Sequence, residues 1–328
     1  MKKLLIISVA ATLICSISFA KIWRVNNNAG VVANFTTAQL ANDNASVLAG
    51  DTIHIEPSIT SYGNLTCNKR LTWISTGAFL SSHPNEQFSS NVGSVGTVST
   101  NAGSANSVFQ MSIAGNFSVN TTSISIDRCY VSSSIVIDQF ASGANNNTVV
   151  INSYVGSSIQ IFGSNNHIIT NNVVGAGFSV SGSNTAATIT HNVFNAISTT
   201  ASAAANSIIE NNIFNKATAV ANFNNCTVQY NMSGAPNVLP AGNNNQNNIA
   251  MASVFVNNSG TTDSDWVLKA GSPAIGAGSN GVDMGAFGGG SPFRLAMQPP
   301  VPAIYKIQAP AAPAGNTLNV TFSTKSNN

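Results

Sequence analysis

The pentapeptide Thr148-Val-Val-Ile-Asn152 returns four times further along the chain, in altered form. The later copies are IITNN, TITHN, IIENN and TVQYN. The final asparagines of the five copies are Asn152, Asn172, Asn192, Asn212 and Asn231, at steps of 20, 20, 20 and 19 residues. A period this regular predicts a solenoid, in which each repeat forms one coil.

The positions around each asparagine keep the same register. The position two residues before it is mostly polar, which indicates a short β-strand followed by a turn. Equivalent strands of a solenoid stack about 4.8 Å apart, so the asparagines are expected to form a ladder. Asparagine suits this turn because it tolerates left-handed backbone angles and its amide both donates and accepts hydrogen bonds. The column three residues before the asparagine is Val149, Ile169, Ile189, Ile209 and Val228, and the column two residues after it is Tyr154, Val174, Phe194, Phe214 and Ser233.

The expected fold class is all-β, a right-handed parallel β-helix. A leucine-rich repeat also uses an asparagine at similar spacing, but this chain lacks the recurrent leucines. A β-sandwich would not keep so even a period. Long α-helices are disfavoured because Glu, Lys, Arg and Leu are scarce, whereas Asn, Thr, Val and Ile are plentiful.

Upstream coils are less regular. Residues 124–131 align with the first repeat if one turn is longer, which places Tyr130 in the aromatic column and Arg128 at the asparagine position. Earlier coils are expected to begin near Val108 and Leu71.

The open end of a solenoid needs a cap, because an exposed terminal coil invites edge pairing. Residues 36–48 carry apolar residues at helical spacing and are expected to form a short amphipathic capping helix. Residues 50–57 and 70–77 read as the first strands, and residues 81–106 as inserted loops.

Three segments are expected. Residues 1–20 read as a signal peptide, with a basic start, a short apolar stretch and a cleavage site after Ala20. Residues 21–290 form the β-helix domain with its caps. Residues 291–328 form a Pro-rich connector and a terminal strand at 317–323, for which packing back on the coil is preferred over pairing with another molecule. The mature chain is expected to be secreted, periplasmic or on the outer cell surface.

Composition limits the partners and cofactors. Charged residues are 7% of the chain and the formal net charge is +2, with no basic stripe, so nucleic-acid binding is disfavoured. No later stretch reads as a transmembrane segment. Cys67, Cys129 and Cys226 suit buried apolar side chains better than a disulfide framework or a zinc site. No cofactor and no metal is expected.

Two stretches resemble a known family. Residues 49–57, AGDTIHIEP, are similar to the entry of pectate-lyase-like β-helix proteins. Residues 265–278 and 283–288 resemble the C-terminal signature of secreted bacterial right-handed parallel β-helix repeat proteins, common in Bacteroidetes. The resemblance implies the fold. It says little about activity, because the superfamily mixes lyases, hydrolases, adhesins and proteins without known activity.

Catalytic residues are scarce on the central coils. Lyases of this fold need a basic residue, usually beside calcium, and glycosidases need at least two carboxyl groups. Residues 129–262 offer only Asp138, Glu210 and Lys216 as charged side chains. No catalytic residue is therefore assigned.

The local polar cluster is Asp127, Arg128 and Asp138, which reads as a salt bridge at a coil edge rather than an acid–base pair. His167 and His191 occupy different repeat positions, without cysteine or carboxylate at ligand spacing.

The expected function is a non-catalytic protein of the cell envelope with a structural, adhesive or carbohydrate-binding role, whose partner is a polysaccharide or an envelope component. One alternative is a polysaccharide lyase or glycoside hydrolase. A second alternative is a self-assembling surface fibre joined by the C-terminal strand. The site of the enzyme alternative would draw on Glu56, Lys69, Arg70, Glu86, Asp127 or Arg128.

Overall fold

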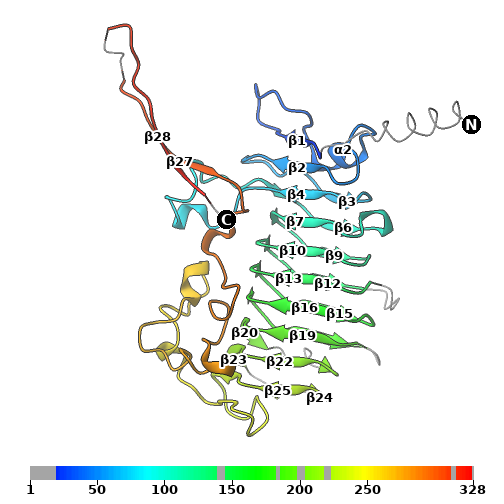
Figure 1. Ribbon diagram of the computed structural model, residues 1–328, viewed down its shortest axis with the longest axis vertical. Coiled ribbons are helices and arrows are strands. Elements are labelled where there is room, and N and C mark those ends of the chain that lie inside the picture. Colours follow the sequence, from blue (N-terminus) through cyan, green and yellow to red (C-terminus); the bar gives the residue numbers. More distant parts are fainter. Residues whose placement is uncertain are drawn as a thin grey trace, which may run out of the picture.

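The chain winds into a right-handed parallel β-helix (Figure 1). The computed structural model describes residues 20–138, 145–181, 185–197, 204–217, 223–311 and 315–326. Each coil passes in turn through three parallel sheets, which we call sheets 1, 2 and 3. The expected fold class is confirmed.

Sheet 1 has ten strands: β1 (Ile22–Val25), β2 (Thr52–Ile55), β4 (Thr72–Ile74), β7 (Val108–Gln110), β10 (Ser125–Asp127), β13 (Val149–Ile151), β16 (His167–Thr170), β19 (Ala187–Thr190), β22 (Ile208–Glu210) and β25 (Thr227–Gln229). Sheet 2 has eight short strands: β5 (Ser94–Val95), β8 (Ser112–Ile113), β11 (Tyr130–Val131), β14 (Tyr154–Val155), β17 (Val173–Val174), β20 (Val193–Ile197), β23 (Ile213–Ala217) and β26 (Met232–Ser233).

Sheet 3 has six strands: β3 (Leu65–Cys67), β6 (Val98–Thr100), β9 (Phe117–Val119), β12 (Ile135–Ile137), β15 (Ile159–Phe162) and β18 (Phe178–Ser181). Two short strands pair beyond it, β21 (Ala204–Ala205) and β24 (Phe223–Asn224). The helices are α2 (Ala38–Asp43) and the 3₁₀ turns η1 (Leu80–Ser82), η2 (Ala102–Ser104), η3 (Met251–Ser253), η4 (Asp263–Trp266), η5 (Ser279–Gly281) and η6 (Leu295–Met297).

The register corrects the first repeat by one residue. Val150 of β13 pairs with Ile169 of β16, so Asn152 aligns with Asn171, and Ser153 aligns with Asn172. The expected place of Asn152 in the ladder is therefore wrong. The same shift turns Tyr154 to the outer side of sheet 2, where it pairs with Val173. A one-residue slip moves a side chain to the opposite face of a strand.

The ladder itself consists of the other four asparagines, which are all fully buried: Asn172, Asn192, Asn212 and Asn231. Asn192 shows the pattern. Its backbone N–H and its Nδ2 both donate to Oδ1 of Asn212, at 2.9 and 3.0 Å. Its Nδ2 also donates to the carbonyls of Ile169 and Thr190, both at 2.9 Å.

Each end of the ladder has a substitute. Beyond Asn231, Oδ1 of Asn245 accepts from the backbone N–H and Nδ2 at 3.1 Å. Before Asn172, the Ser153 N–H donates to Oδ1 of Asn172 at 2.9 Å, and Oγ of Ser153 accepts from the Cys129 N–H at 3.0 Å. Every amide of the column is thereby satisfied within the coil.

The left-handed residue of each turn is the one before the ladder position. These residues have φ between 52° and 59°. The expectation that the ladder asparagine itself adopts this conformation is wrong, because the turn must precede the inward-pointing side chain. The left-handed column is Arg128, Asn152, Asn171, His191, Asn211 and Tyr230.

The interior of the coil is filled with stacked apolar side chains. Phe178, Phe194 and Phe214 stack with ring centroids 5.0 to 6.5 Å apart. Near the N-terminal end, Trp73 lies parallel to Phe109, with centroids 6.5 Å apart. Aromatic pairs of this kind add to the stabilisation from burial.

A second apolar core lies outside sheet 2, beneath the C-terminal part of the chain. Residues 272–298, which we call the strap, run alongside the coil toward its N-terminal end (Figure 1). Left-handed-column residues hold the strap: Nδ2 of Asn171 donates to the carbonyls of Ala286 and Gly288 at 3.0 and 2.8 Å. Nη1 of Arg128 donates to the carbonyl of Gln298 at 3.2 Å.

Other contacts hold the strap at further coils. Oδ1 of Asn211 accepts from the Ser279 N–H at 2.9 Å. With its amide turned so that both atoms are satisfied, Asn152 donates to the carbonyls of Ser291 and Pro292 at 3.0 and 3.2 Å.

The N-terminal cap is the expected short helix, α2, but it is shorter than residues 36–48. Thr37 caps it by accepting from the Leu40 N–H, and Ala38 and Ala41 are buried on the coil. Leu40 and Leu48 are exposed instead of lying on the buried face. Residues 81–106 also differ from expectation, because β5 and β6 lie within them; the inserted loop is residues 75–93.

The C-terminal strands β27 (Ala303–Gln308) and β28 (Thr321–Lys325) form an antiparallel hairpin that projects from the coil (Figure 1). The terminal strand thus pairs with part of the expected connector rather than packing back along the coil. The hairpin touches the inserted loop through the Lys325–Glu86 ion pair and the Phe88 N–H, which donates to the carbonyl of Ile304 at 3.0 Å. The helices of the described residues all fall short of the length and hydrophobicity that a membrane span requires.

We expect Asn192→Ala to lower the free energy of unfolding by about 2–4 kcal/mol, because it leaves buried partners of the ladder unpaired. Urea denaturation followed by circular dichroism measures the loss. The control is Asn91→Ala, since Asn91 is exposed in the inserted loop. Equal stability of the two variants would show that the ladder does not stabilise the coil.

Candidate functional site

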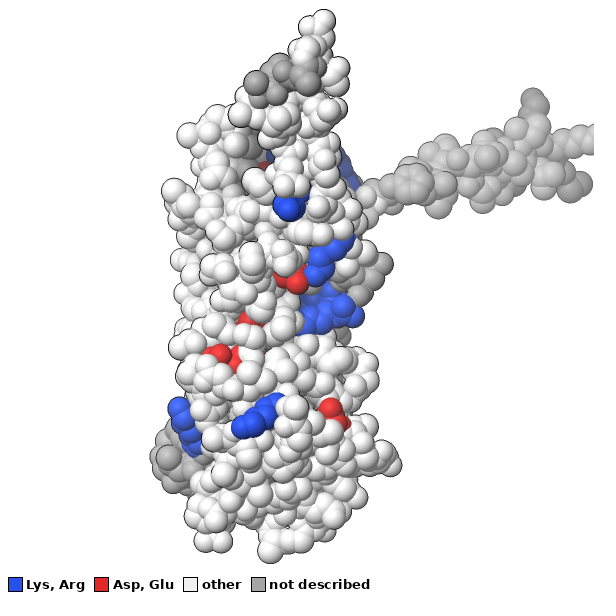
Figure 2. Space-filling model, turned by 90° about the vertical axis from the view of Figure 1, so that its left-hand side faces the viewer, with Lys and Arg blue, Asp and Glu red and all other residues white. Residues whose placement is uncertain are grey.

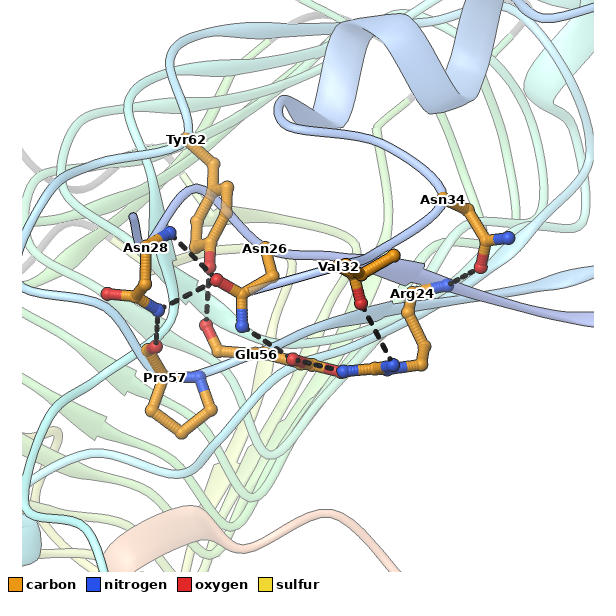
Figure 3. A network of polar contacts seen from close by, with 8 residues as sticks. All are labelled: Arg24, Asn26, Asn28, Val32, Asn34, Glu56, Pro57 and Tyr62. Carbon is orange, nitrogen blue, oxygen red and sulfur yellow. Dashed lines mark hydrogen bonds and ion pairs between the residues drawn. The ribbon is translucent and has the colours of Figure 1, made fainter. Parts of the chain in front are cut away.

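Glu56 belongs to a closed network at the N-terminal end of the coil (Figure 3). Its carboxylate accepts from Nε and Nη2 of Arg24 and, at 2.6 Å, from Nδ2 of Asn26. Burial raises the pKa of Glu56, but these hydrogen bonds and the Arg24 charge outweigh burial and lower it overall. The carbonyl of Glu56 also accepts from Tyr62 Oη at 2.9 Å. This network joins β1 to β2, and hydrogen bonds occupy both carboxylate oxygens of Glu56.

The other residues of the enzyme alternative lie in separate places. Nζ of Lys69 donates to the carbonyls of Asn44 and Val47, in the segment that follows helix α2, at 2.6 and 3.1 Å. Arg70 is exposed at the corner before β4. Glu86 lies in the inserted loop, paired with Lys325.

The expected polar cluster is divided between two corners of one coil. Nε of Arg128 lies 3.9 Å from Oδ1 of Asp127, whose Oδ2 accepts from Gln110 at 2.8 Å. Asp138 follows β12 in sheet 3, where it is fully buried and accepts from Nδ2 of Asn145 at 2.8 Å. Asp127 and Arg128 therefore form the expected contact at a coil edge. Asp138 instead contacts Asn145 at the corner that follows β12.

His167 is buried and has structural partners on both nitrogens. Its Nδ1 accepts from the Thr148 N–H at 3.3 Å, which leaves the proton on Nε2, 2.9 Å from Oγ of Ser164. Burial lowers the pKa of His167 to about 4, although Asp138 and Ser164 act in the opposite direction. The imidazole is therefore neutral at physiological pH.

His191 faces the strap instead. It lies in the left-handed column, and its Nε2 is 3.2 Å from Nδ2 of Asn211. Burial lowers its pKa, and Glu210 opposes the shift. Across the described residues, no three His, Cys, Asp or Glu side chains gather as a metal site would require.

The two aspartates of the C-terminal signature hold turns. Oδ2 of Asp265 accepts from the Thr261 N–H at 2.8 Å, and hydrogen bonds of this kind outweigh burial and lower its pKa. Oδ1 of Asp283 accepts from the Gly276 N–H at 2.8 Å.

One face of the molecule has few charges. Figure 2 shows the side that carries the strap and hairpin, where Lys, Arg, Asp and Glu form small scattered patches on an uncharged surface. Sites for ligand contact on such a surface depend on aromatic rings, amides and hydroxyl groups.

An uncharged hollow of about 410 Å³ lies between sheet 2 and the inserted loop. We call it the aromatic hollow. Its volume falls within the range of small-ligand sites, roughly 300–1,000 Å³. Its lining residues are Ala78, Phe79, Val92, Ser94, Ser112, Ile113, Ala114, Tyr130 and Ser132.

The place of the aromatic hollow follows from the column of side chains on the outer face of sheet 2. At the later coils this column is aliphatic and lies beneath the C-terminal part of the chain, as at Val193 and Ile213. At the earlier coils it becomes Tyr130, Ser112 and Ser94, paired in register. The change from aliphatic to hydroxyl side chains gives the column a polar end, which faces the inserted loop across the hollow.

Phe79, Tyr130 and Tyr154 form an aromatic cluster at this end. Phe79 meets Tyr130 edge-on, with centroids 5.5 Å apart at 90°, and Tyr154 stacks on Tyr130 with centroids 5.8 Å apart. Phe79 has φ of 54°, a left-handed conformation that is rare for a bulky side chain. Such strain, of about 1–3 kcal/mol, persists where surrounding contacts enforce it and is frequent at ligand sites.

Ser112 supplies an unused polar group. The residue is 2% exposed and its Oγ has no hydrogen-bond partner among the described residues. A buried hydroxyl without a partner costs about 1–3 kcal/mol. Because Ser112 lines the hollow, a hydroxyl of a bound ligand is a suitable partner for it.

Sequence reasoning found Tyr130 but not its role. It placed Tyr130 in an aromatic column, and the structure pairs it with Tyr154 on the outer side. The sequence does not mark Phe79 or Ser112 as site residues. The positive φ of Phe79 and the outward direction of the Ser112 side chain can be recognised only when the coil register is known.

The chain has no match among family models, curated proteins or solved structures.

The neutral state of His167 predicts a pH-dependent stability. Its folded pKa is about 4, below the ordinary 6.5, so the unfolded chain binds the proton first. Stabilisation is full above pH 6.5 and falls toward pH 4. The slope that His167 contributes is at most about 1.4 kcal/mol per pH unit. Urea unfolding between pH 7 and 4.5 should give a smaller slope for His167→Gln than for wild type. Identical slopes would contradict a buried neutral His167.

Proposed function

We propose that the chain is an exported, non-catalytic β-helix protein that binds a neutral polysaccharide in the aromatic hollow. The observation that supports this proposal is the combination of Phe79, Tyr130 and the unpartnered hydroxyl of Ser112 in one hollow at the N-terminal end of sheet 2. Sugar rings present C–H faces, which pack on aromatic rings, and hydroxyl groups, which exchange hydrogen bonds with serine.

The lining favours an uncharged ligand. Apart from the Tyr130 phenol, every lining side chain is apolar or bears a serine hydroxyl. A charged ligand would lose hydration there without gaining a counter-charge.

The arrangement of charged groups supports binding without cleavage. A glycosidase needs two carboxyl groups facing one bond, whereas the carboxylates of Glu56, Glu86 and Asp127 each contact a different basic side chain. We also propose, from the stretches at residues 49–57 and 265–288, a distant relation to pectate-lyase-like β-helix repeat proteins. Export rests on the signal-peptide pattern of residues 1–20.

A self-assembling role is the second candidate, and the hairpin favours it. Ile304, Ile307 and Phe322 are 41–57% exposed on a two-stranded sheet that contacts the inserted loop at Glu86 and Phe88. A two-stranded sheet is marginally stable in water without further packing. We expect a chain ending at residue 300 to scatter light as a monomer, and the full chain to show larger species at high concentration. A monomeric full chain would rule out assembly.

Polysaccharide binding is tested by affinity electrophoresis on xylan, mixed-linkage β-glucan, homogalacturonan and alginate. We expect retardation on one of the neutral polymers. Tyr130→Ala should weaken it roughly tenfold or more, since an aromatic contact is lost, and Ser112→Ala severalfold. Tyr130→Phe should bind like wild type.

The matched control is Tyr305→Ala, because Tyr305 lies on the hairpin rather than in the hollow. Unchanged retardation of Tyr130→Ala would refute the site. New reducing ends or unsaturated products released by the wild-type chain would refute the non-catalytic proposal.

A further inference from the structure

A second hollow, of about 290 Å³, lies on the outer side of sheet 1, where β16, β19 and β22 stack. We call it the notch. The partly or fully exposed residues that line it are Asn166, Ile168, Ala186, Thr188, Asn206 and Ile208.

The notch exists because the middle coil has smaller side chains than the coils on either side. In the strand register, Thr188 lies between Ile168 and Ile208. Two residues earlier in each coil, Ala186 lies between two asparagines. The outer two coils therefore form ridges, and the middle coil forms the floor between them.

The ridges expose apolar surface. Ile168 and Ile208 are each 43% exposed. Of the large apolar side chains whose exposure the structure describes on strands β2 to β26, these two alone are exposed. Exposed apolar side chains that flank a hollow favour contact with an apolar partner.

The hairpin has an exposed apolar face of its own. Ile307 pairs with Phe322, and Ile304 pairs with Thr324 two residues further on, so all four side chains lie on one face. The register shift after Ile304 is the bulge that brings both isoleucines to this face. Ile304, Ile307 and Phe322 are 41–57% exposed.

The hairpin contacts its own molecule in other ways. Lys325 follows Thr324 and thus lies on the opposite face, where it pairs with Glu86. The Phe88 N–H donates to the Ile304 carbonyl along the edge of β27. Neither contact uses the apolar face. Figure 1 places the hairpin beside the N-terminal coils, several coils away from β16, β19 and β22, so the hairpin and the notch of one molecule do not meet.

We propose that the notch receives the hairpin of a second copy of this chain. The Phe322 ring packs on the floor at Thr188, between the two isoleucine ridges. Both surfaces are uncharged where they meet: the described lining of the notch contains no Lys, Arg, Asp or Glu, and Lys325 lies on the other face of the hairpin. This inference rests on the second candidate function, self-assembly, and names the surface that receives the hairpin.

The rim of the notch also suits a strand edge. β28 pairs with β27 on one side, and its other edge carries backbone N–H and C=O groups. Asn166 and Asn206 are exposed at the rim, and their amides both donate and accept hydrogen bonds. These amides can therefore pair with the outer edge of an incoming β28.

A contact between two different surfaces repeats from copy to copy. Such a heterologous contact produces a ring or an open fibre rather than a closed dimer. One hairpin is small compared with the roughly 1,200–2,000 Å² that a standard stable interface buries. We therefore expect weak, concentration-dependent assembly.

The test is sedimentation velocity of the full chain and its variants over a range of concentrations. Phe322→Ser should raise the dissociation constant of assembly roughly tenfold or more, because an aromatic contact is lost. Thr188→Lys should abolish assembly, because it fills the notch and places a charge against the ring. Ile208→Ser should weaken assembly severalfold.

Each class of variant has a matched control. Thr72→Lys makes the same change in the same outward column of sheet 1, outside the notch. Ile59→Ser removes an apolar side chain that is 88% exposed and belongs to neither surface. Both controls should assemble like wild type, and thermal unfolding verifies that every variant is folded.

Mixing two variants tests the contact directly. Phe322→Ser keeps an intact notch, and Thr188→Lys keeps an intact hairpin. We expect each alone to be a monomer and equal amounts together to form a species of twice the chain mass that grows no further. A mixture that stays monomeric while wild type assembles would overturn the proposal.

Two further outcomes separate this inference from self-assembly itself. If wild type assembles and Thr188→Lys assembles equally well, the notch is not the receiving surface, although self-assembly stands. If wild type is monomeric at every concentration, both are refuted.

Discussion

The buried asparagine amide is the interaction on which the rest of the structure depends. Oδ1 of Asn212 accepts both the backbone N–H and the Nδ2 proton of Asn192, so each coil satisfies polar groups of its neighbour. Sliding one coil by a single residue would leave these groups unpaired in the apolar interior. The ladder therefore fixes the coil register, and the register decides which side chains face the core and which face outward. Asn245 and Ser153 complete it where the repeat ends.

Two adjacent residues of each turn point in opposite directions and make different contacts. The ladder residue points inward, while the left-handed residue before it points outward and holds the strap, as Asn171 does. Because of this division, a chain with 7% charged residues can hold the strap against its coils. Hydrogen bonds between side-chain amides and backbone carbonyls take the place of ion pairs there. The outer column of sheet 2 is apolar under the C-terminal part of the chain and bears a hydroxyl at Ser112.

The solenoid and four ladder positions could be predicted from the sequence, because their spacing reflects a single physical period. Asn152 could not be placed correctly, since the stretch around it reads equally well in two registers that differ by one residue, and only pairing with β16 decides between them. The aromatic hollow could not be predicted from the sequence for another reason. Phe79 has a strained backbone conformation and meets Tyr130 only because the inserted loop lies beside sheet 2. No periodicity encodes such long-range contacts.

The strap has a consequence for how the protein acquires and keeps its structure. Coil contacts join residues about one repeat apart, so coils can form one after another by local steps. The strap joins Arg128 to Gln298, 170 residues later in the chain, so we expect this contact to form after the intervening coils. Interactions made after the folding transition state slow unfolding without accelerating folding. We therefore expect the strap to lengthen the lifetime of the folded coil without changing how fast the coil forms.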